Sequence, residues 1–147
     1  MRVQRLARKP GKRARFRSQL RRFLRFSEQA ARAAGLASQQ HQLLLALKGM
    51  PEGMPATIGA LAERLQVRHH TTVGLVDRME ARGLVRRSHT GTDRRQVFVR
   101  LTSRGEGMLP RLSLSHCAEL RSMAPSLLRA LEELVGERAR PPARRHR

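Results

Sequence analysis

The chain contains little of several residue types on which particular classes of function depend. It has no tryptophan, no tyrosine and one cysteine among 147 residues. Because Cys117 is alone, no disulfide can form within the chain, which fits a reducing compartment such as the cytoplasm. Without tryptophan or tyrosine, the sequence does not support an aromatic cage around a ligand. The longest purely apolar run, Leu43–Leu47, is far too short to span a membrane.

Patterns that carry catalysis are also missing. We find no nucleophile elbow, no cluster of metal ligands and no glycine-rich phosphate loop, and acidic residues number only 11. The adjacent pair His69 and His70 is not expected to bind a metal, because neighbouring helical residues point about 100° apart and no third ligand is spaced nearby. We therefore expect a protein that is not an enzyme and has no cofactor.

Positive charge is plentiful and concentrated at the two ends, within a formal net charge of +20. Residues 1–25 carry eleven Lys or Arg and residues 138–147 carry five, and neither segment has an acid. Such blocks stay solvated until they meet a polyanion. We interpret residues 1–14 as a disordered basic arm and 138–147 as a basic tail. The basic ends fit three interpretations: they keep the protein soluble, they bind an anionic membrane surface, or they bind nucleic acid. The core described next favours nucleic acid.

Two helices are expected before a loop. The first covers residues 15–35, with Gly35 as its C-terminal stop. Ser38 then caps a second helix that runs through Leu47. Residues 49–55, rich in glycine and proline, should form a loop.

Two short amphipathic helices with a tight turn between them predict a helix-turn-helix. Thr57 opens the first, which ends at Leu65, and residues 66–67 make the turn. The second helix covers about residues 68–82 and ends at Gly83. The apolar positions follow helical spacing, with Ile58, Leu61, Ala62 and Leu65 in the first and Thr72, Leu75, Val76 and Met79 in the second.

A β-hairpin should follow. Residues 84–88 and 96–101 have strand character, and the charged turn 89–95 between them contains Gly91. The order of helices and hairpin predicts a mainly α fold with a small β-hairpin wing, a winged helix-turn-helix that occupies residues 36–102.

The C-terminal part is expected to be two helices. Thr102 caps a helix to about Ser122, and Pro110 should kink it or delay its start. Pro125 suits the first turn of a separate last helix. These helices leave apolar positions that one subunit cannot bury, so residues 15–35 and 103–137 are interpreted as dimerisation helices. The positions are Leu109, Leu112, Leu120, Met123, Leu127, Leu131 and Leu134.

The segments Leu61–Leu65, Leu75–Val85 and Asp93–Thr102, followed by Gly105, resemble the MarR family of bacterial winged helix-turn-helix transcription regulators. The resemblance covers about residues 20–135. It departs at the turn, where Gln66 replaces a common glycine, and at the start of the second helix, where Arg68-His69-His70 stands. The resemblance implies a homodimer on a palindromic double-stranded DNA site in the bacterial nucleoid. It also implies regulation by a small-molecule effector or by cysteine oxidation.

The second helix of the helix-turn-helix, about residues 68–82, is the expected recognition helix, and it presents its candidate DNA contacts at its N-terminal end. The apolar stripe that begins at Thr72 is expected to be buried. The residues nearest the base edges should then be Arg68, His70, Thr71 and Val73, since arginine can bind guanine and threonine methyls can touch thymine. His69 and Arg78 are expected on phosphates. Thr71 also fits a merely solvated position in the first turn.

In the wing, the resemblance assigns Arg95 to the minor groove, Asp93 to orienting it and Arg94 to phosphate or the groove rim. The alternative is that these three residues only staple the hairpin. Arg86 and Arg87 suit phosphate contacts or a solvated face. Cys117 is expected to be a buried cysteine of a dimer helix rather than a redox sensor.

The predicted function is therefore a dimeric, sequence-specific, ligand-responsive repressor with half-sites about 10 bp apart. The alternative is a non-specific nucleic-acid-binding or architectural protein driven by its basic ends.

Overall fold

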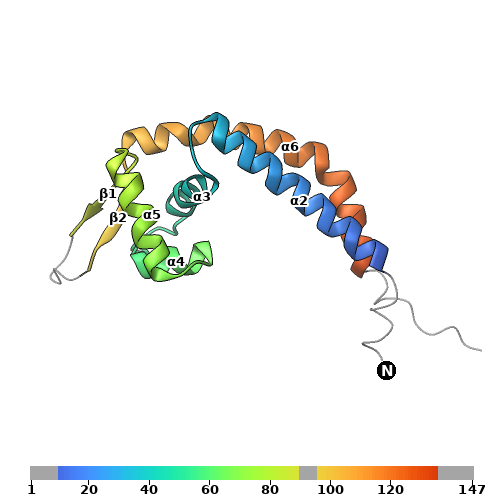
Figure 1. The fold of residues 1–147 in the computed structure, drawn as a ribbon, viewed down its shortest axis with the longest axis horizontal. Helices are drawn as coiled ribbons and strands as arrows, with labels where there is room; N and C mark the ends of the chain where they lie inside the picture. Colours follow the sequence, from blue (N-terminus) through green and yellow to red (C-terminus); the bar gives the residue numbers. More distant parts are fainter. Residues whose placement is uncertain (1–9, 90–95, 136–147) are drawn as a thin grey trace, which may run out of the picture. The chain divides into compact units, whose positions relative to one another are not determined.

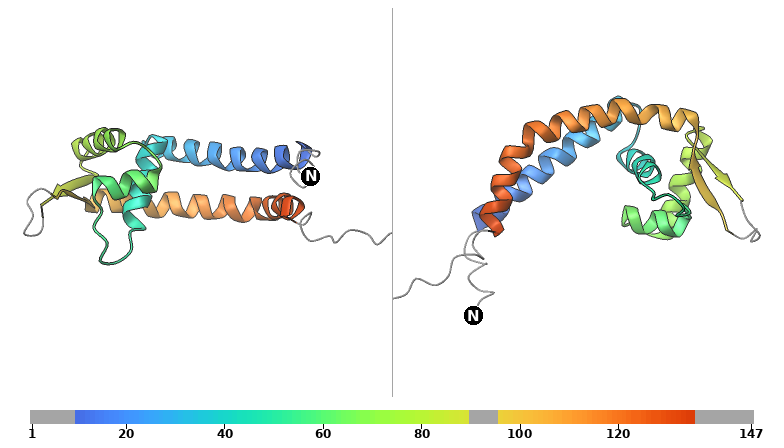
Figure 2. Two further views of the ribbon diagram at one scale, coloured as in Figure 1. Left: turned by 90° about the horizontal axis from the view of Figure 1, so that it is seen from below. Right: turned by 180° about the vertical axis from the view of Figure 1, so that it is seen from behind.

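The computed structural model describes residues 10–89 and 96–135 (Figures 1 and 2). By contacts the chain divides into two compact units, one made by residues 28–115 and one by the described parts of 1–27 and 116–147. The described elements are α2 (Pro10–Ala33), α3 (Ser38–Lys48), α4 (Ile58–Leu65), α5 (His69–Ala81), β1 (Val85–Ser88), β2 (Phe98–Leu101) and α6 (Ser103–Val135). The mainly helical fold with a two-stranded wing is thus confirmed.

The helix-turn-helix of α4 and α5 forms as its sequence signals predict. The Thr57 hydroxyl accepts a hydrogen bond from the N–H of Ala60 at 3.1 Å, which caps α4. Gln66 adopts a left-handed conformation with φ 55°, so it fills a place that glycine adopts at lower cost. Gly83, with φ 68°, ends the recognition helix. The apolar stripes of both helices enter one core with Leu43, Leu44, Leu84, Val85 and Val99.

The wing is an antiparallel pair in which Val85 lies opposite Leu101 and Arg86 lies opposite Arg100. Its strands are shorter than expected, because Leu84 and residues 96–97 fall outside the paired region. The N–H of Val99 donates to the carbonyl of Ala56 at 2.9 Å, so the segment before α4 also joins the hairpin. This bond and the buried Val99 side chain fix the base of the wing to the core.

The start of the first helix differs from the sequence expectation. Helix α2 begins at Pro10, so residues 10–14 are helical rather than disordered, whereas residues 1–9 lie outside the described part. Proline suits the first helical position because its missing N–H would have no partner there. Arg15 also pairs with Glu133 of α6 at 3.1 Å, and Lys12 donates to the carbonyl of Glu133. Contacts along the α6 pairing thus extend the helix past the expected start.

The N-cap of α3 differs from the expected residue. Ala37, not Ser38, is the N-cap, and Ser38 is the first helical residue. The Gln40 side chain reaches back and accepts the Ala37 N–H at 3.0 Å. The glutamine at the third helical position therefore satisfies the N–H of the N-cap residue, and the Ser38 side chain does not cap the helix.

One continuous helix, α6, replaces the two C-terminal helices that the sequence predicts. Each proline within it removes a single backbone N–H, and the apolar spacing of Leu120, Met123 and Leu127 runs across Pro125 without a shift in phase. The Thr102 cap is confirmed: its hydroxyl accepts the Gly105 N–H at 3.1 Å and donates to the Gly83 carbonyl at 2.6 Å.

In the smaller unit, the N-terminal part of α2 lies beside the C-terminal part of α6 (Figure 2). His116 of α6 meets the rings of Phe23 and Phe26 edge-on, at centroid distances of 6.1 and 5.6 Å. Its Nε2 also lies 2.8 Å from the hydroxyl of the buried Ser27. Cys117, expected to be buried, is exposed on the protomer.

Candidate nucleic-acid interface

The recognition helix α5 has one buried face and one free face. Thr72, Leu75, Val76 and Met79 are all buried, as their spacing predicts. The Thr72 hydroxyl donates to the Arg68 carbonyl at 3.3 Å, which satisfies the one polar group on that face. The opposite face of the helix is consequently turned away from the core and carries His70, Gly74, Asp77 and Ala81.

The candidate contacts of α5 lie on or beside this free face. Arg68, His69, His70 and Arg78 are exposed, whereas Thr71 and Val73 are half-buried. Arg68 is the N-cap and makes no side-chain capping bond, so the first N–H groups of α5 are not capped by it. The helix thus presents cationic and imidazole groups together at its positive end.

The three wing residues assigned a role, Asp93, Arg94 and Arg95, lie outside the described residues. The strands that carry them are described. Arg86 and Arg100 face each other across the strands and are both exposed. Like charges directly opposite each other destabilise a hairpin, so this pair is unfavourable in the free protein.

Arg87 does not share the exposure of its neighbour Arg86. Its guanidinium donates to Glu80 and to Asp77 of α5, each at 2.5 Å, and its backbone N–H donates to Glu80 Oε1 at 2.8 Å. We call Asp77, Glu80 and Arg87 the carboxylate clamp. It joins the recognition helix to the first wing strand, so Arg87 fixes their relative position rather than forming part of a solvated face.

The clamp also shifts the ionisation of its members. The hydrogen bond from the Arg87 backbone N–H, helped by its side chain, lowers the pKa of Glu80 against the opposing effect of desolvation. Burial alone would lower the pKa of Arg87, but hydrogen bonds to Asp77 and Glu80 outweigh it and raise that pKa. Both directions mean that the clamp stabilises the charged forms.

A second polar link also lies at the C-terminal end of α5. Arg82 donates to the Gln40 side chain and to the carbonyl of Gly35, both at 2.8 Å. Gly35 has φ 76° and stands in the connector between α2 and α3. The C-terminal end of the recognition helix is therefore tied both to the wing and to this connector.

Comparison with known proteins agrees with this geometry. A family model described as the MarR family matches residues 34–96. The structure of AbsC, a MarR family transcriptional regulator from Streptomyces coelicolor, superposes with a TM-score of 0.66 at 25% identity, over 83% of this chain and 85% of that one.

Residues 34–96 thus match the MarR family, and the chain has the fold of MarR-family regulators.

Two other proteins are similar to parts of this chain. It is 44% identical over 45 residues to YfiV of Bacillus subtilis (strain 168), an uncharacterized HTH-type transcriptional regulator. That match spans 31% of this chain and only 28% of YfiV. The transcriptional repressor CouR, bound to a 23-mer DNA duplex, has the same fold with a TM-score of 0.64 at 24% identity, covering 84% of this chain and 88% of CouR.

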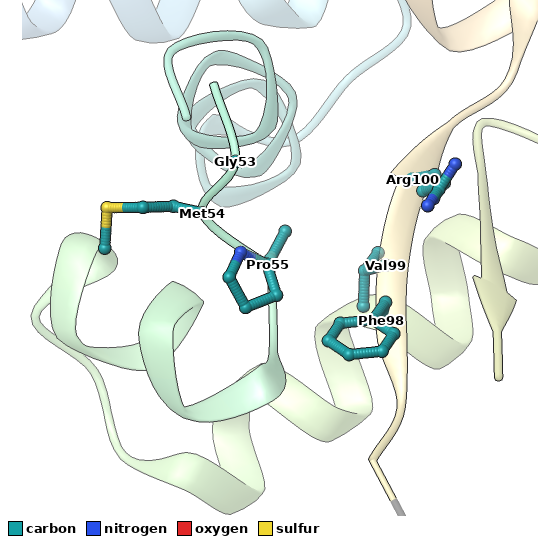
Figure 3. A pocket seen from close by; sticks show the side chains of 7 residues that line it. Gly53, Met54, Pro55, Phe98, Val99 and Arg100 are labelled. Atoms are coloured by element: carbon teal, nitrogen blue, oxygen red, sulfur yellow. The ribbon is translucent and has the colours of Figure 1, made fainter. Parts of the chain in front are cut away.

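A pocket of about 390 Å³ lies beside the wing (Figure 3). One wall is the loop with Gly53, Met54 and Pro55, and the other is β2 with Phe98 and Arg100. The lining contains no carboxylate, histidine or thiol, so it offers no acid–base pair and no nucleophile. It presents apolar surface next to a single guanidinium.

Sequence reasoning missed three features of this site. Gly74 lies in the middle of the free face of α5, Asp77 holds Arg87, and Arg100 opposes Arg86. Helical spacing from His70 places Gly74 and Asp77 on its face and was a usable signal. The Asp77–Arg87 bond had none, because it joins two elements across a turn.

Within residues 10–89 and 96–135, no group of three His, Cys, Asp or Glu is placed to hold a metal ion. In the same part of the chain, no helix is long and apolar enough to cross a membrane.

Proposed function

We propose that this protein is a dimeric, sequence-specific transcription regulator that inserts α5 into the major groove of duplex DNA and lays its wing beside it. The observation that carries the proposal is the free face of α5. His70 is exposed on this face and Arg68, His69 and Arg78 are exposed beside it, and among the described residues none of these four side chains has a hydrogen-bond or ion-pair partner. Unpaired donors on a helix of this fold suit phosphates and base edges.

The position of each residue on α5 decides whether it is assigned to base edges or to phosphates. Arg68 and His70 stand at the N-terminal end, where the helix dipole favours an anion, and with Thr71 and Val73 they are assigned to the base edges. His69 and Arg78 flank this set and are assigned to phosphates. The half-burial of Thr71 and Val73 limits them to short-range methyl contacts.

The wing is assigned to the adjacent backbone and minor groove. Arg95 inserts into the groove, Asp93 orients it and Arg94 lies at the rim. The opposed pair Arg86 and Arg100 supports this assignment, because a nearby phosphate would remove the repulsion that the free hairpin carries. Arg87 is excluded from contacting DNA by its two carboxylate partners.

The dimer is supported by apolar side chains left exposed on the smaller unit. Leu24 is 61% exposed and Leu128 is 56% exposed. Soluble monomers rarely expose many large apolar side chains together, so a second copy is the proposed cover. Two-fold symmetry then demands a two-fold operator with half-sites about 10 bp apart. CouR, a repressor seen on a DNA duplex, supports the mode of binding.

The family resemblance supports repression that responds to a small-molecule effector. A repressor of this kind acts in the cytoplasm at the nucleoid, and no catalytic group or cofactor takes part. The effector remains unassigned to residues of this chain.

The decisive experiment selects binding sites from fragmented genomic DNA at about 150 mM salt, where exposed charges are screened beyond about 8 Å. Wild type, Arg95→Ala and Arg64→Ala are compared, the last removing an exposed arginine of α4 as a charge-matched control. We expect a palindrome from wild type and Arg64→Ala, and its loss from Arg95→Ala. Unbiased sequence from all three proteins would contradict a sequence-specific regulator.

A second candidate, a non-specific nucleic-acid-binding or architectural protein, is favoured by the sixteen basic residues of the segments 1–25 and 138–147. Deleting residues 1–9 and 138–147 together separates the two, since both lie outside the described helices. Loss of all DNA binding would favour this candidate. Retained operator selection would favour the regulator.

A further inference from the structure

The first half of α2 carries a row of arginines that neither the recognition helix nor the wing accounts for. Arg17, Arg21, Arg22 and Arg25 are all exposed, and we call them the arginine face. No acidic residue occurs before Glu28. The sequence pattern alone places this segment among the dimerisation helices, and the ordered helix gives its charges a fixed arrangement.

Helical geometry aligns three of these side chains. Arg17, Arg21 and Arg25 follow one another at intervals of four residues, which corresponds to a rise of about 6 Å per step along one ridge. Phe16 and Phe23 are half-buried and fall on the other side of the helix. The ridge therefore points away from the packing of Phe16 and Phe23, and the exposed Leu24, seven residues after Arg17, lies beside it.

The arginine face has no internal counter-charge. Among the described residues, none of its four side chains makes a hydrogen bond or an ion pair. Arg15, which lies on the side of α2 that meets α6, is paired with Glu133 at 3.1 Å. Like charges at four-residue spacing destabilise a helix, so the row is unfavourable until an anion binds.

The chemistry of the face favours phosphates over a lipid surface. An interfacial helix buries a broad apolar face in the bilayer, whereas the aromatic side chains of α2 are occupied with α6, as the contacts of Phe23 and Phe26 with His116 show. Guanidinium groups form forked, charge-assisted hydrogen bonds with phosphate oxygens. A repeating ridge of them suits a repeating polyanion.

We propose that the arginine face binds the phosphate backbone of duplex DNA as a contact surface additional to α5 and the wing. The choice of DNA as the polyanion rests on the proposed function, but the surface itself does not. It contributes affinity without sequence preference, so it governs the salt dependence of binding rather than the choice of operator.

The test compares binding of a random-sequence duplex by full-length wild type and by the triple variant Arg17→Gln, Arg21→Gln, Arg25→Gln, using fluorescence anisotropy between about 50 and 200 mM salt. The slope of log K against log salt should become shallower by about 0.9 for each phosphate that the variant no longer neutralises. Affinity near physiological salt should fall on the order of 10- to 100-fold. The single variant Arg21→Gln should change the slope by about one third as much.

The matched control is Arg111→Gln, Arg121→Gln, Arg129→Gln, which removes the same charge from exposed positions of α6 that form no four-residue ridge. It should leave the slope close to that of wild type. The charge-conserving variant with lysine at positions 17, 21 and 25 should retain most of the salt dependence. Equal decreases in the glutamine variant and the α6 control would overturn the proposal, because general charge would then explain the binding.

Two further outcomes would overturn it. The triple variant could lose its dimeric state in sedimentation, which would place the arginine face in the subunit interface. Alternatively, wild type could bind phosphatidylglycerol vesicles and the triple variant could lose that binding while it still binds the duplex as wild type does.

Failure of the proposed function gives a different result. Wild type would then select no operator, while the triple variant would still show a shallower salt slope than wild type.

Discussion

At the scale of single residues, two adjacent arginines of the same strand have different roles. Arg86 is exposed, whereas the Arg87 side chain is only 25% exposed and is held by two carboxylates. Successive strand residues point to opposite faces, so this difference follows from the strand itself. The sequence could not say which of the two would meet the carboxylates, because Asp77 and Glu80 belong to the preceding helix.

The carboxylate clamp should make stability depend on pH through Glu80. Because the pKa of Glu80 is lowered below its ordinary value of 4.5, its contribution is complete above that value and is lost as the pH falls through the lowered pKa. We expect Glu80→Gln to lower the free energy of unfolding at neutral pH by roughly 1 kcal/mol, allowing for solvent screening. The difference from wild type should shrink in acid.

Urea unfolding of wild type and Glu80→Gln, measured from neutral pH down into acid, checks the expectation. Glu63→Gln, an exposed glutamate of α4 without a side-chain partner among the described residues, is the control and should follow wild type. A constant gap between Glu80→Gln and wild type at every pH would exclude an ionisation effect.

Gly74 is a second residue-scale test. A Cβ added there would lie 3.5 Å from Arg78 Nη1, an ordinary contact, so Gly74→Ala fits the fold and should stabilise it by up to about 1 kcal/mol. In the proposed complex the free face of α5 meets DNA closely, and the added methyl should weaken operator binding severalfold. Thermal melting and a binding titration measure the two effects. Gly59→Ala, whose Cβ would also have space, should leave binding unchanged.

At the scale of elements, capping and stop residues in the sequence correctly predicted the helix ends that they form. Thr57, Gly83 and Thr102 each mark an end of a helix, and each was placed correctly because a cap or a stop depends on residues a few positions away. The start of α2 at Pro10 and the continuity of α6 through Pro125 were not predicted. Both depend on contacts between distant segments, such as the pair Arg15–Glu133, which no local pattern contains.

The N-terminus of α6 is fitted to the turn after α5, and Gly105 is the close point. A Cβ on Gly105 would come within 2.0 Å of the Leu84 carbonyl oxygen, which is backbone and cannot move aside. Gly105→Ala should therefore destabilise the fold by about 1–3 kcal/mol or more. Gly107→Ala, with nothing within 4 Å of its Cβ, should stabilise the same helix slightly. Denaturant unfolding of both variants measures this, and equal stability would show that the contact yields.

At the scale of the whole molecule, the apolar surplus is smaller than the sequence indicated, because Leu109, Leu112 and Met123 are buried within the protomer while Leu120 is 41% exposed. Leu128 and Leu131 of α6 are 56% and 43% exposed. If a second copy covers them, Leu128→Asp should shift sedimentation equilibrium from dimer toward monomer by at least about tenfold in Kd, since a charge would be buried at the interface. Ser122→Asp, exposed on the same helix, should leave the dimer intact. An unchanged dimer in both variants would place the interface elsewhere.

The opposed arginines of the wing have a consequence for the effect of salt on the protein. Arg86 and Arg100 repel each other at a cross-strand separation shorter than the screening length of about 10 Å at 0.1 M salt. Added salt weakens that repulsion and so stabilises the hairpin of the free protein. The same salt weakens the hold of a cationic wing on phosphates. The ionic conditions that order the wing best are thus those in which it binds least, and DNA itself is the better counter-ion for this pair.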